Sequence, residues 1–140
     1  MKKYLITYGT NKYYNSKFRL ETEVKRLNTF DEIVLYDKSK LSKEFKEKYA
    51  EVLNLKHGDG FWIWKFDIIK QKLDEINDGD YLLYLDAGCA INLEGKERLN
   101  EYFEILNNSK TGNLRFQMHQ NKEKYYTSKE LFNYFNLKPN

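Results

Sequence analysis

The stretch INDGDYLLYLDAG at residues 76–88 decides the fold that we expect. Its residues Asn77, Asp78 and Gly79 are a strong stop signal for the helical pattern that precedes them. The run YLLYL that follows is apolar throughout, which is typical of a parallel strand covered on both faces. Asp86 comes directly after this run, where a buried strand would meet solvent. The stretch therefore predicts a helix, a tight connection and a buried strand that ends in a carboxylate.

Strands and helices alternate along the rest of the chain. Short apolar runs predict further strands at residues 3–7, 30–36 and 114–118. Apolar residues at helical spacing predict helices within residues 20–27, 42–53, 62–76 and 95–106, and one more that begins near residue 127. Such alternation is typical of a mostly parallel sheet with helices on both faces. We therefore expect residues 1–140 to form a single α/β domain.

The helix predicted at residues 62–76 has the clearest pattern. Five apolar residues recur at steps of four, three, four and three, so we expect them to face the core: Trp62, Phe66, Ile69, Leu73 and Ile76. Trp64 lies off this stripe and would line a pocket or pack under a loop. Lys65 stands in the first turn, where a cation opposes the helix dipole. A bound anion would explain this lysine, and so would a salt link to Asp59 or Asp86; both explanations stay open.

The last predicted helix has a start signal of its own. Thr127 and Glu130 have the spacing of a capping box, in which each side chain accepts from a free backbone amide of the other residue. Tyr126 and Leu131 flank the box at the spacing of a hydrophobic staple. This pattern predicts that the helix is capped by Thr127.

The composition excludes several classes of protein. With 140 residues, 41% of them hydrophobic, and one cysteine, the chain predicts a compact domain without a disulfide framework. It has no apolar run of about 18 residues, so we expect no membrane span, and residues 1–8 are too short for a secretory signal. The net charge of +3 is too small to indicate a nucleic-acid partner. We expect a cytoplasmic protein of a reducing compartment.

Polar loops follow the predicted strands, at residues 8–16, 36–39 and 86–92. In open α/β sheets, ligands bind beyond the carboxyl ends of the strands. Asp86 could hold a divalent cation against the phosphates of a ligand, because hard cations prefer carboxylate oxygens, or it could cap a turn. Gly88 would permit either a tight turn or the close approach of a ligand to the backbone. His119 follows the strand predicted at residues 114–118, as a metal ligand, a base or an ordinary surface histidine.

Several blocks taken together resemble a known family. The blocks are ITYGT at residues 6–10, GDGFWIWK at 58–65, INDGDYLLYLDAG at 76–88 and FQMH at 116–119. In this order and spacing they are similar to the small GT-A-fold glycosyltransferases of viral and bacterial polysaccharide synthesis. The resemblance extends from about Tyr4 to about Phe135, and its most specific part is residues 58–88. It implies a Rossmann-like, nucleotide-sugar-binding half of a GT-A fold.

The resemblance also implies a ligand and a cofactor. The ligand would be a nucleotide-sugar donor, a UDP- or GDP-sugar, and the acceptor a glycan. Asp86 would match the first aspartate of a DxD-type motif, which holds Mn²⁺ or Mg²⁺ on the diphosphate, while Gly88 stands where a second aspartate is common. Arg19 and Lys65 would lie toward the diphosphate. The other residues implied in nucleotide-sugar binding are Thr7, Tyr8, Gly9, Thr10, Trp64, Ala87 and Gly88.

The chain departs from the family in its length. It is shorter than GT-A catalytic domains usually are, and residues 138–140 (KPN) resemble the interior of a longer chain, so we expect the acceptor-binding half to be missing. No catalytic base stands out; Asp59, His119 and Glu123 are candidates by position alone.

Other kinds of function stay open beside the transferase. The chain could be a non-catalytic nucleotide-sugar-binding or assembly module, with a second copy in a homo-oligomer as a candidate partner. A phosphoacceptor receiver domain is disfavoured, because Tyr8, Gly9 and Thr10 stand where its acidic pair would follow the first strand. A dinucleotide-binding domain is disfavoured as well, since no GxGxxG follows that strand.

Overall fold

Three parallel strands form the sheet in the computed structural model, which describes residues 1–138. The strands are β1 (Lys3–Tyr8), β2 (Glu32–Tyr36) and β3 (Tyr81–Tyr84), in the order β2-β1-β3. Ile6 of the central strand pairs with Val34 on one side and Tyr84 on the other. These strands confirm three of the four predicted from the sequence. Of residues 138–140, which resemble the interior of a longer chain, the last two lie outside the described residues.

Helices connect the strands and continue beyond them. The long helices are α1 (Tyr14–Leu27), α5 (Trp64–Glu75) and α6 (Lys96–Asn107). The shorter ones are α2 (Lys43–Lys48), α3 (Ala50–Leu53), α4 (Gly58–Phe61) and α7 (Lys129–Tyr134). Short 3₁₀ turns lie at Asn11–Tyr13, Lys38–Lys40, Leu93–Gly95 and Glu123–Tyr125. Among the described residues, no helix has the length and apolar character needed to cross a membrane.

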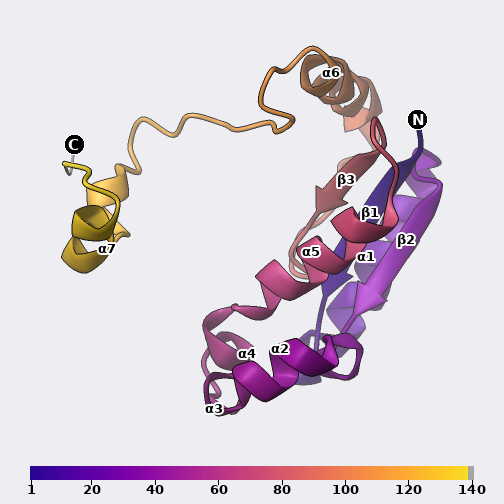
Figure 1. Cartoon of the computed structure of the whole chain (residues 1–140). Helices are drawn as coiled ribbons and strands as arrows, with labels where there is room; N and C mark the ends of the chain where they lie inside the picture. Colours follow the sequence, from indigo (N-terminus) through magenta and orange to yellow (C-terminus); the bar gives the residue numbers. More distant parts are fainter. Residues whose placement is uncertain (139–140) are drawn as a thin grey trace.

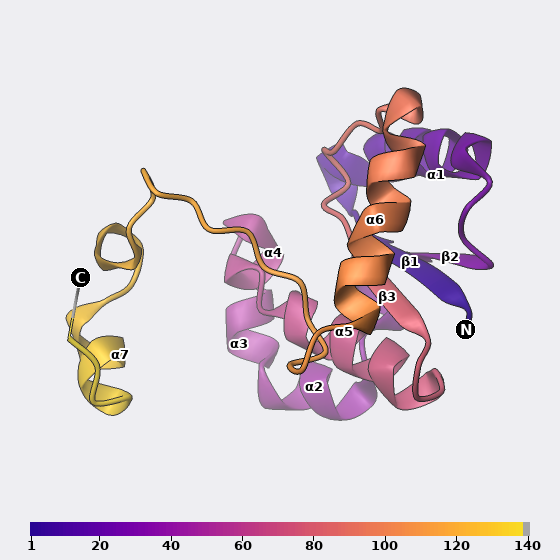
Figure 2. The same cartoon turned by 90° about the horizontal axis from the view of Figure 1, so that it is seen from above.

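Helices cover both faces of the sheet, as the sequence predicts (Figures 1 and 2). Side chains of successive residues in a strand point to opposite faces. Leu5 therefore packs on one face with Leu20 and Val24 of α1, whereas Ile6 packs on the other with Ile68 of α5. All five of these aliphatic side chains are fully buried. The architecture is a mixed α/β fold with a small parallel sheet between two hydrophobic clusters.

The orientation of α5 corrects the prediction for the two tryptophans. Trp64 is 4% exposed and lies in the core, whereas Trp62 is 47% exposed. Trp62 precedes the helix and has a φ of 60°, so it does not belong to the helical stripe from which we predicted its burial. Phe66 and Leu73, on the same predicted stripe, are also exposed, at 76% and 54%. The helix thus turns a different face to the sheet, and of the predicted stripe Ile69 packs against the core.

The buried face of α5 contains polar residues, so the apolar stripe does not identify it. Asp67 is buried but accepts hydrogen bonds from the backbone N and the Oγ of Ser42, at 2.8 and 2.6 Å. Lys72 is buried too, and its Nζ pairs with Glu32 and Glu75, at 3.0 and 2.9 Å. Buried charges are tolerated when they are paired in this way. Side-chain pairing therefore allows this face to pack inward although its sequence is polar.

The prediction of a strand at residues 114–118 is wrong. In the described chain these residues adopt no regular secondary structure, and Figures 1 and 2 show the chain leaving the sheet after α6. A strand needs the hydrogen bonds of a neighbouring strand, and an apolar run cannot supply them alone. His119 therefore does not lie at the end of a strand, because it follows this irregular segment.

The predicted cap of the last helix is also wrong, by one residue. Ser128 is the N-cap of α7, and its Oγ accepts from the backbone N of Leu131 at 3.3 Å. Thr127 instead donates its hydroxyl to the carboxylate of Glu123. The predicted staple partners Tyr126 and Leu131 are both exposed. Serine and threonine are comparable caps, so the pattern located the helix without resolving which of two adjacent residues begins it.

Candidate functional site

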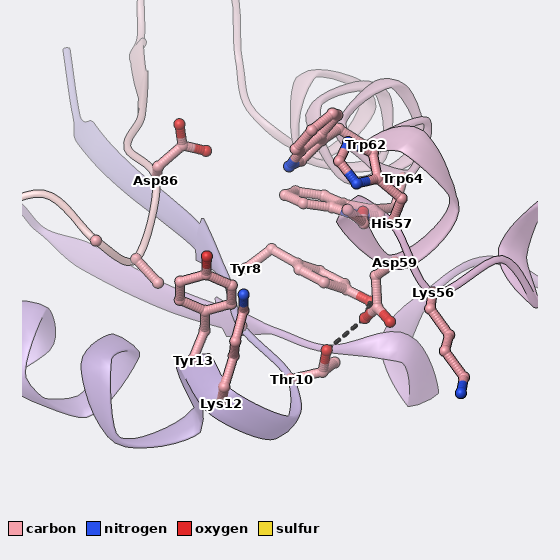
Figure 3. A pocket seen from close by; sticks show the side chains of 14 residues that line it. Tyr8, Thr10, Lys12, Tyr13, Lys56, His57, Asp59, Trp62, Trp64 and Asp86 are labelled. Atoms are coloured by element: carbon pink, nitrogen blue, oxygen red, sulfur yellow. Dashed lines mark hydrogen bonds between the residues drawn. The ribbon is translucent and has the colours of Figure 1, made fainter.

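A pocket of about 710 Å³ opens at the carboxyl ends of β1 and β3 (Figure 3). Three segments that are far apart in the sequence form its wall: the loop after β1, residues 56–64, and the loop after β3. The residues that line it are Tyr8, Gly9, Thr10, Lys12, Tyr13, Lys56, His57, Gly58, Asp59, Trp62, Trp64, Asp86, Ala87 and Gly88. The pocket lies where open α/β sheets bind their ligands.

Asp86 is exposed at the end of β3, and it projects at one side of the pocket (Figure 3). Its Oδ1 lies 3.0 Å from the Nζ of Lys65 and accepts a hydrogen bond from the hydroxyl of Tyr84. Partial burial raises the pKa of Asp86, but the bonds from Tyr84 and Lys65 outweigh it and hold the pKa below its usual value. The carboxylate is therefore charged at neutral pH.

This ion pair explains the position of Lys65 in the first turn of α5. A salt link to Asp86 is one of the two explanations that the sequence leaves open. The ammonium of Lys65 also lies 5.0 Å from the ring centre of Tyr84 and 5.7 Å from that of Trp64, within the range of cation–π attraction. The carboxylate and the two rings together offset the unfavourable helix dipole. The ion pair places one positive and one negative charge at the same side of the pocket.

Two stacked rings lie under the pocket. The rings of Tyr8 and Trp64 are 3.8 Å apart at their centres and 14° from parallel. The Nε1 of Trp64 donates to the carbonyl of Gly58 at 3.0 Å, which satisfies the buried indole. Burial and the neighbouring carboxylate of Asp59 raise the pKa of Tyr8 well above its usual value, so its hydroxyl stays protonated and donates. The stack joins β1 to α5.

The loop after β1 needs a glycine at its start. A Cβ added at Gly9 would lie 2.8 Å from the backbone oxygen of Tyr13, closer than such atoms approach. The absence of a side chain lets the 3₁₀ turn Asn11–Tyr13 fold back over the strand end. This turn brings Tyr13 and Lys12 to the rim of the pocket.

The opposite side of the pocket is built on a left-handed turn. Residues 58–62 all have positive φ, between 51° and 94°, and three of them, Asp59, Phe61 and Trp62, are not glycine. L-residues in this region cost about 1–2 kcal/mol each, and runs of them are rare. At Gly60 a Cβ would lie 2.9 Å from the Cα of Leu53, so glycine is required there for packing as well. This turn directs Asp59 toward β1.

Asp59 connects this turn to the first strand. Its Oδ2 accepts from the hydroxyl of Tyr8 at 3.0 Å and from the hydroxyl of Thr10. Figure 3 shows the carboxylates of Asp59 and Asp86 at opposite sides of the pocket. The pocket therefore has two acidic ends with aromatic rings between them.

The structure brings together most of the residues implied by the resemblance. Eight of the predicted site residues line the pocket: Tyr8, Gly9, Thr10, Asp59, Trp64, Asp86, Ala87 and Gly88. Thr7 does not, because its side chain is fully buried in the sheet. Arg19 lies outside the lining, where its guanidinium donates to the backbone oxygens of Cys89, at 2.8 Å, and Ala87, at 3.4 Å. It supports the loop after β3 from behind.

Two of the candidate catalytic bases are distant from this pocket in the fold. His119 and Glu123 are exposed, outside its lining, in the stretch that leaves the sheet after α6 (Figure 1). Of the three candidates only Asp59 lines the pocket, and its Oδ2 already accepts two hydroxyl groups. Asp59 is thus the one candidate base that the structure places at this pocket.

Sequence reasoning missed six lining residues: Lys12, Tyr13, Lys56, His57, Gly58 and Trp62. Lys12 and Tyr13 stand in the loop after the first strand, so the strand-end rule could have included them. Residues 56–62 follow no strand, and only their packing against β1 brings them to the site. No local sequence pattern predicts that residues 56–62 line this pocket.

Gly88 has no structural need for glycine within the described chain. It lines the pocket, and a Cβ added there would meet no atom within 4 Å. Its φ lies outside the left-handed region, unlike that of Gly58 or Gly60. Gly88 nevertheless lies in a tight turn, which is closed by a hydrogen bond from the backbone N of Cys89 to the carbonyl of Asp86 at 2.9 Å. The tight-turn explanation is therefore confirmed, and the approach of a ligand to Gly88 stays a prediction.

The residues around Asp86 fit a divalent cation as one ligand of several. Among the described residues, no cluster of three or more His, Cys, Asp or Glu side chains could hold a metal by itself. Within the same part of the chain, the Oδ1 of Asp86 carries the bonds from Lys65 and Tyr84, and its Oδ2 has no hydrogen-bond partner. Mg²⁺ is commonly bound by one or two carboxylates together with phosphate oxygens and water. The site suits a cation that arrives with a phosphorylated ligand.

Comparison of the chain with protein-family models, curated proteins and solved structures found no match in any of the three.

Proposed function

We propose that this chain binds a nucleoside-diphosphate sugar in the strand-end pocket and acts as the donor-binding part of a metal-dependent glycosyltransferase, with a glycan as acceptor. The observation that carries this proposal is the shared pocket of the loop after β1 and the exposed Asp86 after β3. These are the two segments to which the resemblance assigns the nucleotide and the diphosphate. The finer description of the fold, as the nucleotide-sugar-binding half of a GT-A domain, belongs to the same proposal.

The dimensions and chemistry of the pocket support a ligand of this class. A volume of about 710 Å³ lies within the range of sites that enclose small molecules and cofactors. The aromatic side chains of Tyr8, Tyr13 and Trp62 offer surfaces for a base or a sugar ring. The cationic and anionic groups of Lys65 and Asp86 offer contacts for a diphosphate and its counterion.

The residues at the Asp86 side suit the departure of a nucleoside diphosphate. Negative charge builds on this leaving group as the glycosidic bond breaks, and fixed positive charge nearby lowers the barrier. Lys65 holds such a charge beside the pocket, and Asp86 would hold the cation through its Oδ2. When bound, Mn²⁺ or Mg²⁺ would neutralise part of the charge on the diphosphate oxygens.

Titration calorimetry with UDP, GDP and their sugars, with and without Mn²⁺, tests this proposal. We expect binding that Mn²⁺ strengthens, and we expect Asp86→Asn to remove that strengthening while the melting temperature changes little, because the side chain of Asp86 is 59% exposed. Asp74→Asn is the matched control: Asp74 also pairs with a lysine on α5, Lys70, but lies outside the pocket. Folded protein that binds none of these ligands would refute the proposal.

A second candidate function is a non-catalytic binding or assembly module. It is favoured by the exposure of apolar side chains away from the pocket, on the outer face of α5 and in residues 113–138. Examples are Phe66 at 76%, Tyr126 at 73% and Tyr134 at 78%. Large apolar side chains that are exposed in this way are candidates for contact with a partner. Light scattering that shows a homo-oligomer, together with nucleotide binding but no sugar transfer or donor hydrolysis, would favour this function over the transferase.

A further inference from the structure

The two oxygens of the Asp59 carboxylate have different surroundings. Oδ2 accepts from two hydroxyl groups, those of Tyr8 and Thr10. Oδ1 has no hydrogen-bond partner among the side chains and backbone groups that the structure describes, and Asp59 lines the pocket. The carboxylate thus offers a bound ligand one acceptor oxygen, held in place through the other.

The backbone holds this oxygen in a fixed direction. Asp59 has φ 57° and ψ 46°, in the middle of five consecutive residues of positive φ. Two contacts secure the turn: the indole Nε1 of Trp64 donates to the carbonyl of Gly58, and the backbone N of Trp62 donates to the same carbonyl at 3.1 Å. Strained backbone of this kind persists where the surrounding contacts over-determine it, and it is concentrated at functional sites. The strained backbone therefore marks Asp59 as a candidate for contact with a ligand.

The position of Asp59 suits the nucleoside end of the proposed ligand. The proposed function puts the diphosphate beside Asp86 and Lys65, and Figure 3 shows Asp59 across the pocket from Asp86. A nucleoside diphosphate that starts at Asp86 would extend its base toward Asp59 and Lys56. Both of these residues line the pocket.

A carboxylate oxygen discriminates between bases because it only accepts hydrogen bonds. The ring nitrogens at the pairing edges of uracil (N3) and guanine (N1) carry a proton and donate, whereas those of adenine (N1) and cytosine (N3) carry a lone pair. Guanine has a second donor, its amino group, next to N1–H, and this pair is best matched by both oxygens of a carboxylate. Because Oδ2 of Asp59 is already engaged, the single open oxygen suits the single N–H of uracil.

We propose that the Oδ1 of Asp59 accepts the N3–H of uracil, so that the chain selects uridine diphosphates over guanosine, adenosine and cytidine diphosphates. This inference rests on the proposed function. The carbonyl groups that flank N3–H in uracil are acceptors, and Lys12, which lines the pocket, supplies an ammonium group as a donor. Asp59 is accordingly a specificity residue for the base.

The test is titration calorimetry of the full chain with UDP, GDP, ADP, CDP and inorganic pyrophosphate, each in the presence of Mn²⁺. We expect UDP to bind at least about tenfold more tightly than ADP and CDP, whose ring nitrogens would leave the Oδ1 of the half-buried Asp59 without a donor. We expect UDP to bind more tightly than GDP as well, because the amino group of guanine would be left without an acceptor. Pyrophosphate, which has no base, measures the diphosphate contribution alone.

Asp59→Asn tests the residue itself. The amide keeps an oxygen for Tyr8 and Thr10 and tolerates the left-handed backbone, but it puts a donor where the open acceptor was. We expect UDP binding to weaken at least about tenfold, with pyrophosphate binding unchanged. Glu123→Gln is the matched control, since it makes the same chemical change at an exposed carboxylate outside the pocket.

The outcomes separate this inference from the function on which it rests. If GDP, ADP or CDP binds as tightly as UDP, the inference is overturned while the proposed function stands. The same holds if the Asp59→Asn variant binds UDP as tightly as the unmodified chain does. Failure of every nucleotide and of pyrophosphate to bind overturns the proposed function. The ranking of nucleotides uses the unmodified chain, so it decides the matter even where the variant fails to fold.

Discussion

Residues 1–112 and residues 113–138 differ in how far their apolar side chains are buried. In the first region, both faces of the sheet are covered, and Leu5, Ile6, Leu20 and Ile68 are fully buried. In the second, Phe132 is the single buried hydrophobic residue among those described, while Phe116, Met118 and others are more than half exposed. The two regions have similar apolar patterns in their sequences, so pattern alone does not decide burial. A surface to pack against decides it.

The difference also separates the candidate site from the rest of the chain. Every residue that lines the pocket lies between Tyr8 and Gly88. One link from the second region to the first is aromatic: the ring of Phe116 packs edge-on against that of Tyr102 of α6, with the ring centres 5.2 Å apart. The first region thus contains both the core and the site, and the following predictions examine that division.

The largest expected effect is a contrast between two aliphatic side chains. Ile68→Ala should lower the free energy of unfolding by about 2–5 kcal/mol, because it leaves a cavity under the sheet. Leu137→Ala should change it by less than about 0.5 kcal/mol, since Leu137 is 60% exposed. Urea denaturation of both variants measures the contrast. Equal losses would mean that residues 113–138 pack against the body in solution.

A smaller contrast is expected between two glycines of positive φ. Gly60→Ala should cost about 2–4 kcal/mol, because the strain of the left-handed backbone adds to a clash with the backbone of Leu53. Gly112→Ala has the strain alone, since a Cβ there meets nothing within 4 Å of the described chain, and should cost about 1–2 kcal/mol at most. Thermal unfolding of the pair gives both values. If Gly60→Ala were as mild as Gly112→Ala, the left-handed turn that carries Asp59 would not be rigid.

The smallest effect is expected from removing residues 113–140 altogether. The shortened chain should still unfold in one cooperative transition, with a melting temperature within about 4 °C of that of the full chain, because it keeps both hydrophobic clusters. Differential scanning calorimetry measures this, and nucleotide titration of the same protein checks the pocket. Loss of the transition would show that the second region is part of the core.

Local sequence signals predicted the sheet better than the helix beside it. The structure confirms the strand predicted from the apolar run at residues 81–85, as β3, and the exposed Asp86 that follows it. A continuous apolar run between stop signals is typical of a strand that is covered on both faces. The predicted face of α5 is wrong, because the apolar stripe begins at Trp62 and this residue belongs to the left-handed turn. Two charged residues, Asp67 and Lys72, find partners on other elements and so are buried. Those partners are not visible in the helix itself.

The amino-acid sequence by itself determined the order of the three strands and of the long helices, the covering of both sheet faces and the carboxylate at the end of β3. These features depend on apolar runs and on the residues next to them. Only the tertiary structure decided that Asp59 joins Tyr8 and Thr10 at the pocket. The reason is physical: a left-handed turn and a packed tryptophan set the direction of that side chain, and neither leaves a periodic trace in the chain.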